Sequence, residues 1–424
     1  MKFSIKLPRL QDILLVYFFS MQFLRSYVFS HLPGGNMLAL LCLVSLIAAT
    51  MLKDRNFIYK YKDIFIYFGL LVAIFGFQFI INPSTRVWLT REFGIGIALI
   101  VGGIFAYPVL RLQDDFDKMI RGLKIAALLQ GLMYAKMALE PIRKGYWEYT
   151  QFGVLKRSSS NMSWSYGLLF VICICAYMVI VEKKKYMSIP IAAGLAGILL
   201  YGSRGTIISF IIGTALTILF YNNDRQDYRK YVIVIAAALV VVFVFSDTGV
   251  NLIAGLAEKY EWDSRFIRSF VNAAQGDSSF SDESSGRDKI WKLVVKLISE
   301  KPLGYGVMGH RNAIYRIGIK WGYSHNIFLD ILAEWGVIIG SALIILAGTG
   351  IMRFLLLVKN KPEKLLFIIF ITVSCELLLS GYMWIHYGVW ALLALYINHF
   401  VFGWTKERPI DTLLKLIKYK GAKK

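Results

Sequence analysis

Apolar residues gather in runs of about 18–22 positions with few charges, the length that a helix needs to cross a bilayer. The first run follows Lys2, Lys6 and Arg9 directly, so we expect it to be a membrane helix and not a cleaved signal peptide. The runs predict an all-α polytopic membrane protein with twelve transmembrane helices, near 11–30, 35–52, 63–81, 92–109, 120–139, 162–181, 187–202, 204–221, 230–247, 325–352, 364–380 and 383–402.

Lysine and arginine residues are unequally distributed between alternate connections of these helices. Counted from a cytoplasmic N-terminus, the inner connections carry basic clusters such as 53–62 and 183–185, whereas the short outer connections carry few. This bias is typical of cytoplasmic loops, so we expect both termini inside the cell. The tail 403–424 has a basic amphipathic pattern suited to the inner surface of the membrane.

The segment 248–324 is a long connection between the ninth and tenth predicted helices. Apolar residues recur at helical spacing in 251–270 and 288–300, with a polar hinge at 275–286 between them. The glycine-rich PLGYGVMG (302–309) suits a loop whose backbone approaches a ligand closely. We predict four parts: membrane helices in 1–247, a partly helical extracytoplasmic domain in 248–324, membrane helices in 325–402 and the cytoplasmic tail 403–424.

The composition excludes several classes of function. The formal net charge of +21 accompanies 57% hydrophobic residues and no nucleic-acid-binding motif, so the cytoplasmic bias and anionic headgroups explain the charge. The four cysteines lie in apolar runs without metal-ligand spacing. The sequence also lacks HExxH, a phosphate-binding GxxxxGK[ST] loop and a GxSxG elbow. We therefore expect no nucleic-acid partner, no metal and no cofactor.

Three arginines are candidate ligands for an anion at the outer face: Arg157, Arg204 and Arg287. A cation at the membrane boundary is costly unless an anionic partner is present, and the guanidinium fork binds phosphate oxygens bidentately. Each has a structural alternative, because Arg204 could form a salt bridge and Arg287 could be a surface residue paired with an acid. The other outer cations are expected to contact lipid headgroups: Arg86, Arg91, Arg143 and Lys144.

The stretch GYSHNIFLDILAEWG (322–336) places three ionisable groups at the start of an apolar run. His325 lies at its aqueous end, whereas Asp330 and Glu334, four residues apart, share one helix face about one and two turns deeper. We expect both carboxyl groups to face the interior of the bundle, protonated or paired with arginine. The alternatives are a helix-capping role for His325 and helix packing for the two acids. The remaining histidines have no supporting pattern: His31, His310, His386 and His399.

Several of these segments together resemble the bacterial O-antigen polymerase and O-antigen ligase family. The resemblance lies in GR-x₃-W-x₁₀-PLGYG (286–306), YSHNIFLDILAEWG (323–336), LLYGSRGTIISF (199–210) and RSSSN (157–161). It implies a metal-independent membrane glycosyltransferase of the GT-C type in the bacterial inner membrane. Such enzymes transfer a glycan from undecaprenyl pyrophosphate to an acceptor hydroxyl outside that membrane.

The resemblance also implies roles for individual residues. Arg204 and Arg287 would bind the donor pyrophosphate, and His325 would act near the acceptor hydroxyl. Substrate-binding roles follow for Arg157, Asn161, Asn326, Asp330 and Glu334. The chemistry fits, because pyrophosphate is a competent leaving group whose charge arginines neutralise, while histidine accepts the hydroxyl proton.

Three functions are compatible with this sequence. We favour a polymerase of lipid-linked polysaccharide repeat units, whose acceptor is a second lipid-linked glycan. The first alternative is an O-antigen ligase, whose acceptor is lipid A–core. The second is a transporter or flippase for lipid-linked glycans, against which the long outer segment 248–324 argues. Membrane lipids and a chain-length regulator are further candidate partners.

Overall fold

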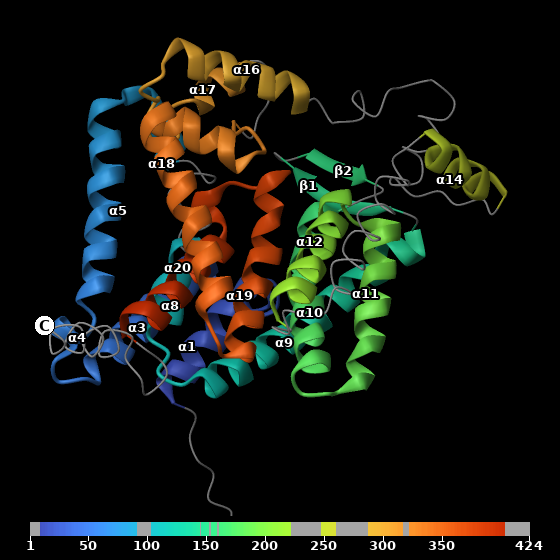
Figure 1. Ribbon diagram of the computed structural model, residues 1–424, viewed down its shortest axis with the longest axis horizontal. Coiled ribbons are helices and arrows are strands. Elements are labelled where there is room, and N and C mark those ends of the chain that lie inside the picture. The colour runs from blue at the N-terminus through green and yellow to red at the C-terminus, as the bar shows by residue number, and fades with distance from the viewer. Residues whose placement is uncertain are drawn as a thin grey trace, which may run out of the picture.

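The chain folds into a bundle of helices with one small β-hairpin (Figure 1). The computed structural model describes residues 9–90, 103–144, 146–151, 154–158, 161–221, 247–259, 287–316 and 322–402. Within these ranges the helices are α1 (Leu10–Phe19), α2 (Met21–Tyr27), α3 (Gly35–Leu52), α4 (Phe57–Lys60), α5 (Lys62–Ile81), α6 (Arg86–Thr90), α8 (Ala106–Arg111), α9 (Phe116–Lys144), α10 (Met162–Ile180), α11 (Ser188–Tyr201), α12 (Arg204–Phe220), α14 (Asp247–Lys259), α16 (Arg287–Glu300), α17 (Arg311–Arg316), α18 (Ile327–Leu357), α19 (Lys361–Ser374) and α20 (Tyr387–Ile397).

The predicted membrane helices are found in part. In the described ranges, α3, α5, α10 and α18 are long and apolar enough to cross a membrane, and the first predicted span is a pair of helices bent by 71°. Shorter apolar helices occupy other predicted ranges, including α11 and α12. The predicted span 230–247 and most of 92–109 lie outside the described residues. The all-α membrane class therefore holds, whereas the number twelve stays a prediction.

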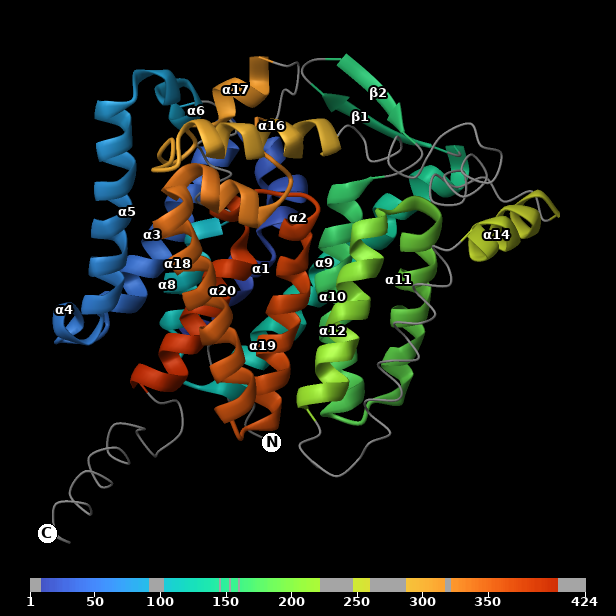
Figure 2. The same ribbon diagram turned by 45° about the horizontal axis from the view of Figure 1, so that its top comes forward.

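The bundle is held together by packing between helices that are distant in the sequence. α10 packs on α9, α11 and α19, while α20 packs on α8 and α19 (Figure 2). Aromatic side chains fill the contacts; Phe19 of α1, for example, lies 5.7 Å from Phe170 of α10 between ring centroids. The largest buried cluster combines residues from α1 through α20. The central helices are thus fixed to one another.

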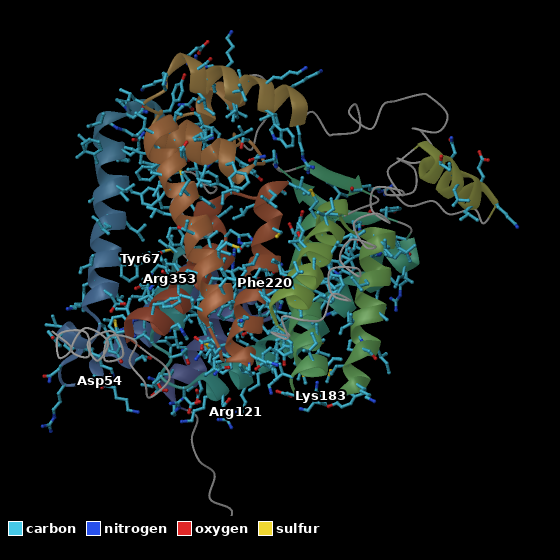
Figure 3. The ribbon with its side chains drawn as sticks, viewed as in Figure 1. Asp54, Tyr67, Arg121, Lys183, Phe220 and Arg353 are labelled. Carbon is cyan, nitrogen blue, oxygen red and sulfur yellow. The ribbon has the colours of Figure 1, made fainter. Side chains whose placement is uncertain are left out.

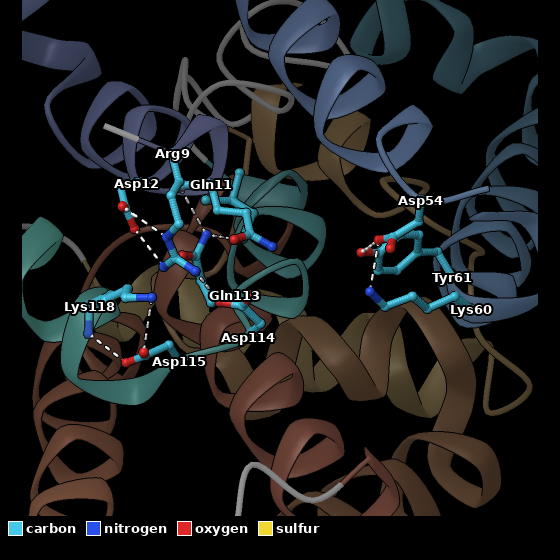
Figure 4. Close-up of polar contacts among 11 residues, drawn as sticks. Arg9, Gln11, Asp12, Asp54, Lys60, Tyr61, Gln113, Asp114, Asp115 and Lys118 are labelled. Carbon is cyan, nitrogen blue, oxygen red and sulfur yellow. Dashed lines mark hydrogen bonds and ion pairs between the residues drawn. The ribbon is translucent and has the colours of Figure 1, made fainter. Parts of the chain in front are cut away.

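Those basic connections predicted to face the cytoplasm that the structure describes lie at one end of this bundle, whereas 222–230 and the tail 403–424 lie outside the described residues. Figure 3 shows Asp54, Arg121 and Lys183 near that end. There Arg9 contacts Asp12 at 2.9 Å and Asp114 at 2.6 Å, which joins the start of α1 to the connection before α9 (Figure 4). The opposite end carries α16, α17 and the hairpin (Figure 2). The two sets of segments thus lie at opposite ends of the bundle, and their sidedness stays a prediction.

The hairpin was not predicted from the sequence. Strand β1 (Trp147–Gln151) pairs antiparallel with β2 (Val154–Ser158), in a register that places Glu148 opposite Arg157. Trp147 is buried, packs 5.3 Å from the ring of Trp164, and donates its indole N–H to the carbonyl of Tyr201 at 3.2 Å. The hairpin is therefore anchored on the adjoining ends of α10 and α11.

The long segment 248–324 contains helices close to those predicted. α14 covers the first part of the predicted helix 251–270, and α16 begins one residue before the predicted 288–300. The polar hinge 275–286 lies outside the described residues. α16 packs along α18, with Ile290 and Val294 buried against Ala333. A helical domain thus covers the start of α18.

α18 is broken at Gly336, where φ is 76° and ψ is 172°. A break frees backbone groups that the helix would otherwise pair, and such groups are costly when buried. The loop 302–306 pairs them: Tyr305 N–H donates to Ala333 O at 2.8 Å, Gly306 N–H to Glu334 O at 2.9 Å, and Val337 N–H to Pro302 O at 2.8 Å. The loop therefore replaces the missing turn of α18.

This docking bears on two expectations drawn from the sequence. The backbone of 302–306 approaches the backbone of α18, whereas we had expected it to approach a ligand. A Cβ added at Gly304, where φ is 90°, would lie 2.5 Å from Glu334 O and from Gly336 N. Asp330 and Glu334 both lie in the helical segment before the break, so their positions about one and two turns after His325 are counted along that segment alone.

We predict that Gly304→Ala destabilises the protein by at least about 2 kcal/mol, because it adds both backbone strain and a clash. Thermal unfolding in detergent, followed by the monodisperse fraction, would measure the loss. Gly348→Ala is the matched control, since nothing lies within 4 Å of its added Cβ. Equal stability of the two variants would contradict the docking role of Gly304.

Candidate active site

The segment 322–326 presents His325 immediately before α18, outside the apolar helix. Ser324 fixes this segment through three contacts: its N–H donates to Asp330 Oδ1 at 2.9 Å, its carbonyl accepts from the Trp291 indole at 2.9 Å, and its hydroxyl donates to Asn326 O at 2.8 Å. His325 itself has φ of 58°, a left-handed conformation that is rare for residues other than glycine. Strain of this kind persists where surrounding contacts enforce it, and it concentrates at functional sites.

The imidazole of His325 is held in its neutral form. The ring packs against Tyr323, with 4.4 Å between centroids, and Nδ1 is buried without a hydrogen-bond partner among the described residues. Burial, assisted by the positive charge of Arg287, lowers the pKa of His325 from 6.5 to about 4, although Asp330 opposes the shift. A neutral imidazole at pH 7 can accept a proton, as acceptor activation requires.

Arg287 lies near His325, as the predicted roles require. It begins α16, one helical turn before Trp291, whose indole is bonded to Ser324 beside His325. The charge of Arg287 acts on His325 and Tyr323, and also on Tyr166 of α10. Two of the three predicted catalytic residues, 38 positions apart, are thus brought together by the packing of α16 on α18.

Arg204 is placed by its backbone, which begins α12. The start of α12 is bonded to α10, because Ser203 N–H and the Thr206 hydroxyl both contact the Ser165 hydroxyl, at 3.2 and 3.0 Å. The Tyr166 hydroxyl lies against Gly205, where an added Cβ would be 2.1 Å away. The charge of Arg287 also acts on Tyr166, so the start of α12 lies in the same part of the structure as Arg287. The side chain of Arg204 lies outside the described part of the chain.

Arg157 and Asn161 have partners within the protein. Arg157 is exposed and contacts Glu148 across the hairpin at 3.3 Å, with its guanidinium 4.7 Å from the ring centre of Tyr146. The side chain of Asn161 accepts from Trp164 N–H at 3.0 Å and so caps α10. The backbone N–H of Asn161 donates to Tyr201 O at 3.0 Å, and Tyr201 lies shortly before Arg204 in the sequence. These contacts give both residues structural roles, and their substrate-binding roles stay predictions.

Asp330 and Glu334 are buried, as expected, and both accept hydrogen bonds from protein groups. Asp330 Oδ1 accepts from Ser324 N–H and contacts His310 Nε2 at 3.0 Å. Glu334 accepts from the Trp384 indole and from Met308 N–H, each at 3.0 Å, and from the hydroxyl of Tyr382. The acids therefore join α18 to three other segments, which favours the supporting role over direct contact with substrate.

Sequence reasoning missed His310 and Arg311 at this site. Both are buried, and the guanidinium of Arg311 lies 4.5 Å from the ring centre of Trp88 and 5.0 Å from that of Tyr382. Their position between the PLGYG and SHN motifs was the available signal, but residues 310 and 330 share no local periodicity. No group of three or more His, Cys, Asp or Glu residues suited to a metal occurs in the described ranges.

The fold defines a helical membrane protein in which Arg287 and a neutral His325 lie at the same end of the bundle. Comparison with known proteins indicates which family has a similar sequence in this part of the chain. Residues 189–345 match the family model described as O-antigen ligase, and this region carries Arg204, Arg287 and His325. The match confirms the resemblance to the O-antigen polymerase and ligase family over this part of the chain. Neither the curated proteins nor the solved structures contain a match.

Asn326 is predicted to stabilise the site as the N-cap of α18. Its side-chain oxygen accepts from Phe328 N–H at 3.0 Å and from Leu329 N–H at 3.3 Å. Asn326→Ala should therefore cost about 1 kcal/mol of stability, whereas Asn326→Ser should restore most of it. Thermal unfolding of both variants in detergent would measure this. A stable Asn326→Ala protein with weakened donor binding would instead favour the substrate-binding role.

Proposed function

We propose that this protein polymerises lipid-linked polysaccharide repeat units, such as those of O-antigen, capsule or exopolysaccharide. The family match supports a glycosyltransferase of the O-antigen ligase and polymerase type that acts on lipid-linked glycans. The observation that carries the proposal is the placement of Arg287 beside a neutral His325. The motifs PLGYG (302–306) and SHNIFLDILAEWG (324–336) resemble the polymerase branch more closely than the ligase branch.

The donor in this proposal is a glycan on undecaprenyl pyrophosphate. The acceptor hydroxyl oxygen attacks C1 of the reducing-end sugar, and the bond between C1 and the phosphate oxygen breaks. The electron pair of that bond leaves with undecaprenyl pyrophosphate, while the hydroxyl proton passes to the imidazole of His325. Arg287 and Arg204 stabilise the charge that develops on the leaving pyrophosphate, and no metal ion is needed.

The electrostatics of His325 suit this sequence of events. Burial, together with the charge of Arg287, lowers the pKa of His325 and keeps the imidazole neutral before the donor arrives. A bound pyrophosphate offsets that positive charge, which makes His325 a stronger base when the acceptor is to be activated. We propose that the reaction takes place on the extracytoplasmic side, because α16 and α17 lie opposite the basic connections (Figure 2).

The choice of acceptor has a direct test. Purified enzyme in liposomes would be given only undecaprenyl-linked repeat units extracted from cells that lack this gene. We expect a ladder of longer lipid-linked glycans on a gel, together with release of undecaprenyl pyrophosphate. A product that forms only after lipid A–core is added would establish the ligase, the activity after which the matched family model is described. Movement of the glycan across the bilayer without transfer would establish a flippase.

Arg287→Ala and His325→Ala should each lower the initial transfer rate at least about 100-fold, because one loses charge stabilisation and the other the proton acceptor. The matched control for the arginine is Lys296→Ala on the same helix, whose side chain is 72% exposed. The control for the histidine is His31→Ala, in an exposed position. Folded Arg287→Ala and His325→Ala proteins with normal rates would rule out the proposed active site.

A further inference from the structure

A buried histidine–carboxyl hydrogen bond lies next to the segment that carries His325. His310 Nε2 and Asp330 Oδ1 are 3.0 Å apart, and the side chains are 0% and 1% exposed. The second ring nitrogen, His310 Nδ1, is buried and has no hydrogen-bond partner among the described residues. A polar group that is so deeply buried is destabilised when its hydrogen-bond partner is removed.

The carboxyl group of Asp330 fixes the backbone position of the segment that carries His325. Asp330 Oδ1 accepts from Ser324 N–H at 2.9 Å as well as contacting His310. Ser324 immediately precedes His325, whose φ of 58° must be imposed by neighbouring contacts. One oxygen atom therefore links His310 to the strained residue, and the orientation of that oxygen depends on the His310 ring.

Arg311, the residue after His310, also contacts the segment that carries His325. The guanidinium of Arg311 lies 5.8 Å from the ring centre of Tyr323, and Tyr323 packs 4.4 Å from the ring of His325. His310 contacts Asp330, which binds Ser324, and Arg311 lies near Tyr323, so both residues bear on the segment that carries His325. Neither contact requires these side chains to meet substrate.

We propose that His310 is a positioning residue for glycan transfer, acting through Asp330 and Ser324 to hold His325 in its reactive orientation; this rests on the function proposed above. His310 itself takes no part in proton transfer. It orients the carboxylate that clamps the backbone, and the clamp places the imidazole toward the acceptor hydroxyl. A displacement of about 1 Å at a reacting group can cost on the order of 100-fold in rate.

Two substitutions separate the hydrogen bond from the packing. His310→Met fills a similar volume without a donor, whereas His310→Gln places an amide N–H near the position of Nε2. We expect His310→Met to lower kcat about 10- to 100-fold while the donor KM changes less than about threefold. We expect His310→Gln to recover most of that loss.

The chain offers a matched control in a second histidine–carboxylate pair. His399 Nδ1 lies 2.9 Å from the buried Glu363, and its ring packs 5.5 Å from Phe354, near the far end of α18. His399→Met should lower thermal stability in the same manner and leave kcat unchanged. An equal fall in kcat for His399→Met and His310→Met would show that general destabilisation explains both, and would overturn the proposal.

A double-mutant cycle with His325→Ala tests whether His310 acts through His325. If it does, adding His310→Met to His325→Ala slows the residual transfer no further. A multiplied loss would overturn the proposal. Chemical modification of His325 by diethyl pyrocarbonate, followed by mass spectrometry, gives a readout independent of activity. We expect modification to become at least about threefold faster in His310→Met, because the segment is released.

The modification rate should stay at the wild-type value in His310→Gln and His399→Met. An unchanged rate in His310→Met would show that Asp330 holds the segment without His310, and would overturn the positioning role. If His325→Ala retains full transfer while His310→Met still releases His325 to the reagent, the proposed active site fails and the structural link stands. The two proposals can therefore fail separately.

Discussion

The site depends on the docking of loop 302–306 into the break of α18. The break at Gly336 would leave backbone groups unpaired in apolar surroundings, where each costs several kcal/mol. Pro302, Tyr305 and Gly306 supply the partners. Because this loop continues into Met308 and His310, the same docking brings Met308 N–H to Glu334 and His310 to Asp330. The helical domain and the membrane helix thereby become one unit.

Around this unit the ionisable groups divide into two kinds. Asp330 and Glu334 are buried and bonded to protein donors, so their role is to hold segments in place. Arg287 begins α16 and His325 precedes α18, and the charge of Arg287 acts on His325. Buried hydrogen bonds such as these limit the movement of the segments that they join, and a strained residue such as His325 needs that constraint. The buried acids therefore support the segment that carries His325, the predicted partner of Arg287.

Much of the site could be predicted because its motifs are local. Arg287, His325 and the shared face of Asp330 and Glu334 follow from short stretches of sequence, and the structure brings Arg287 near His325. The pair of His310 with Asp330 could not be predicted, because it joins a loop to a helix 20 residues later without a repeating pattern. The hairpin 147–158 was missed because its strands are short and rich in polar residues.

The sequence by itself determined the helical membrane class, the unequal distribution of basic residues and the family motifs. These properties depend on hydrophobic runs, charge and short spacing, all of which act over one or two helical turns. The tertiary structure decided that PLGYG pairs with the broken backbone of α18, and that Asp330 binds Ser324 and His310. Such partners come from distant parts of the chain, and only the packing of α16, α17 and α18 brings them within hydrogen-bond distance.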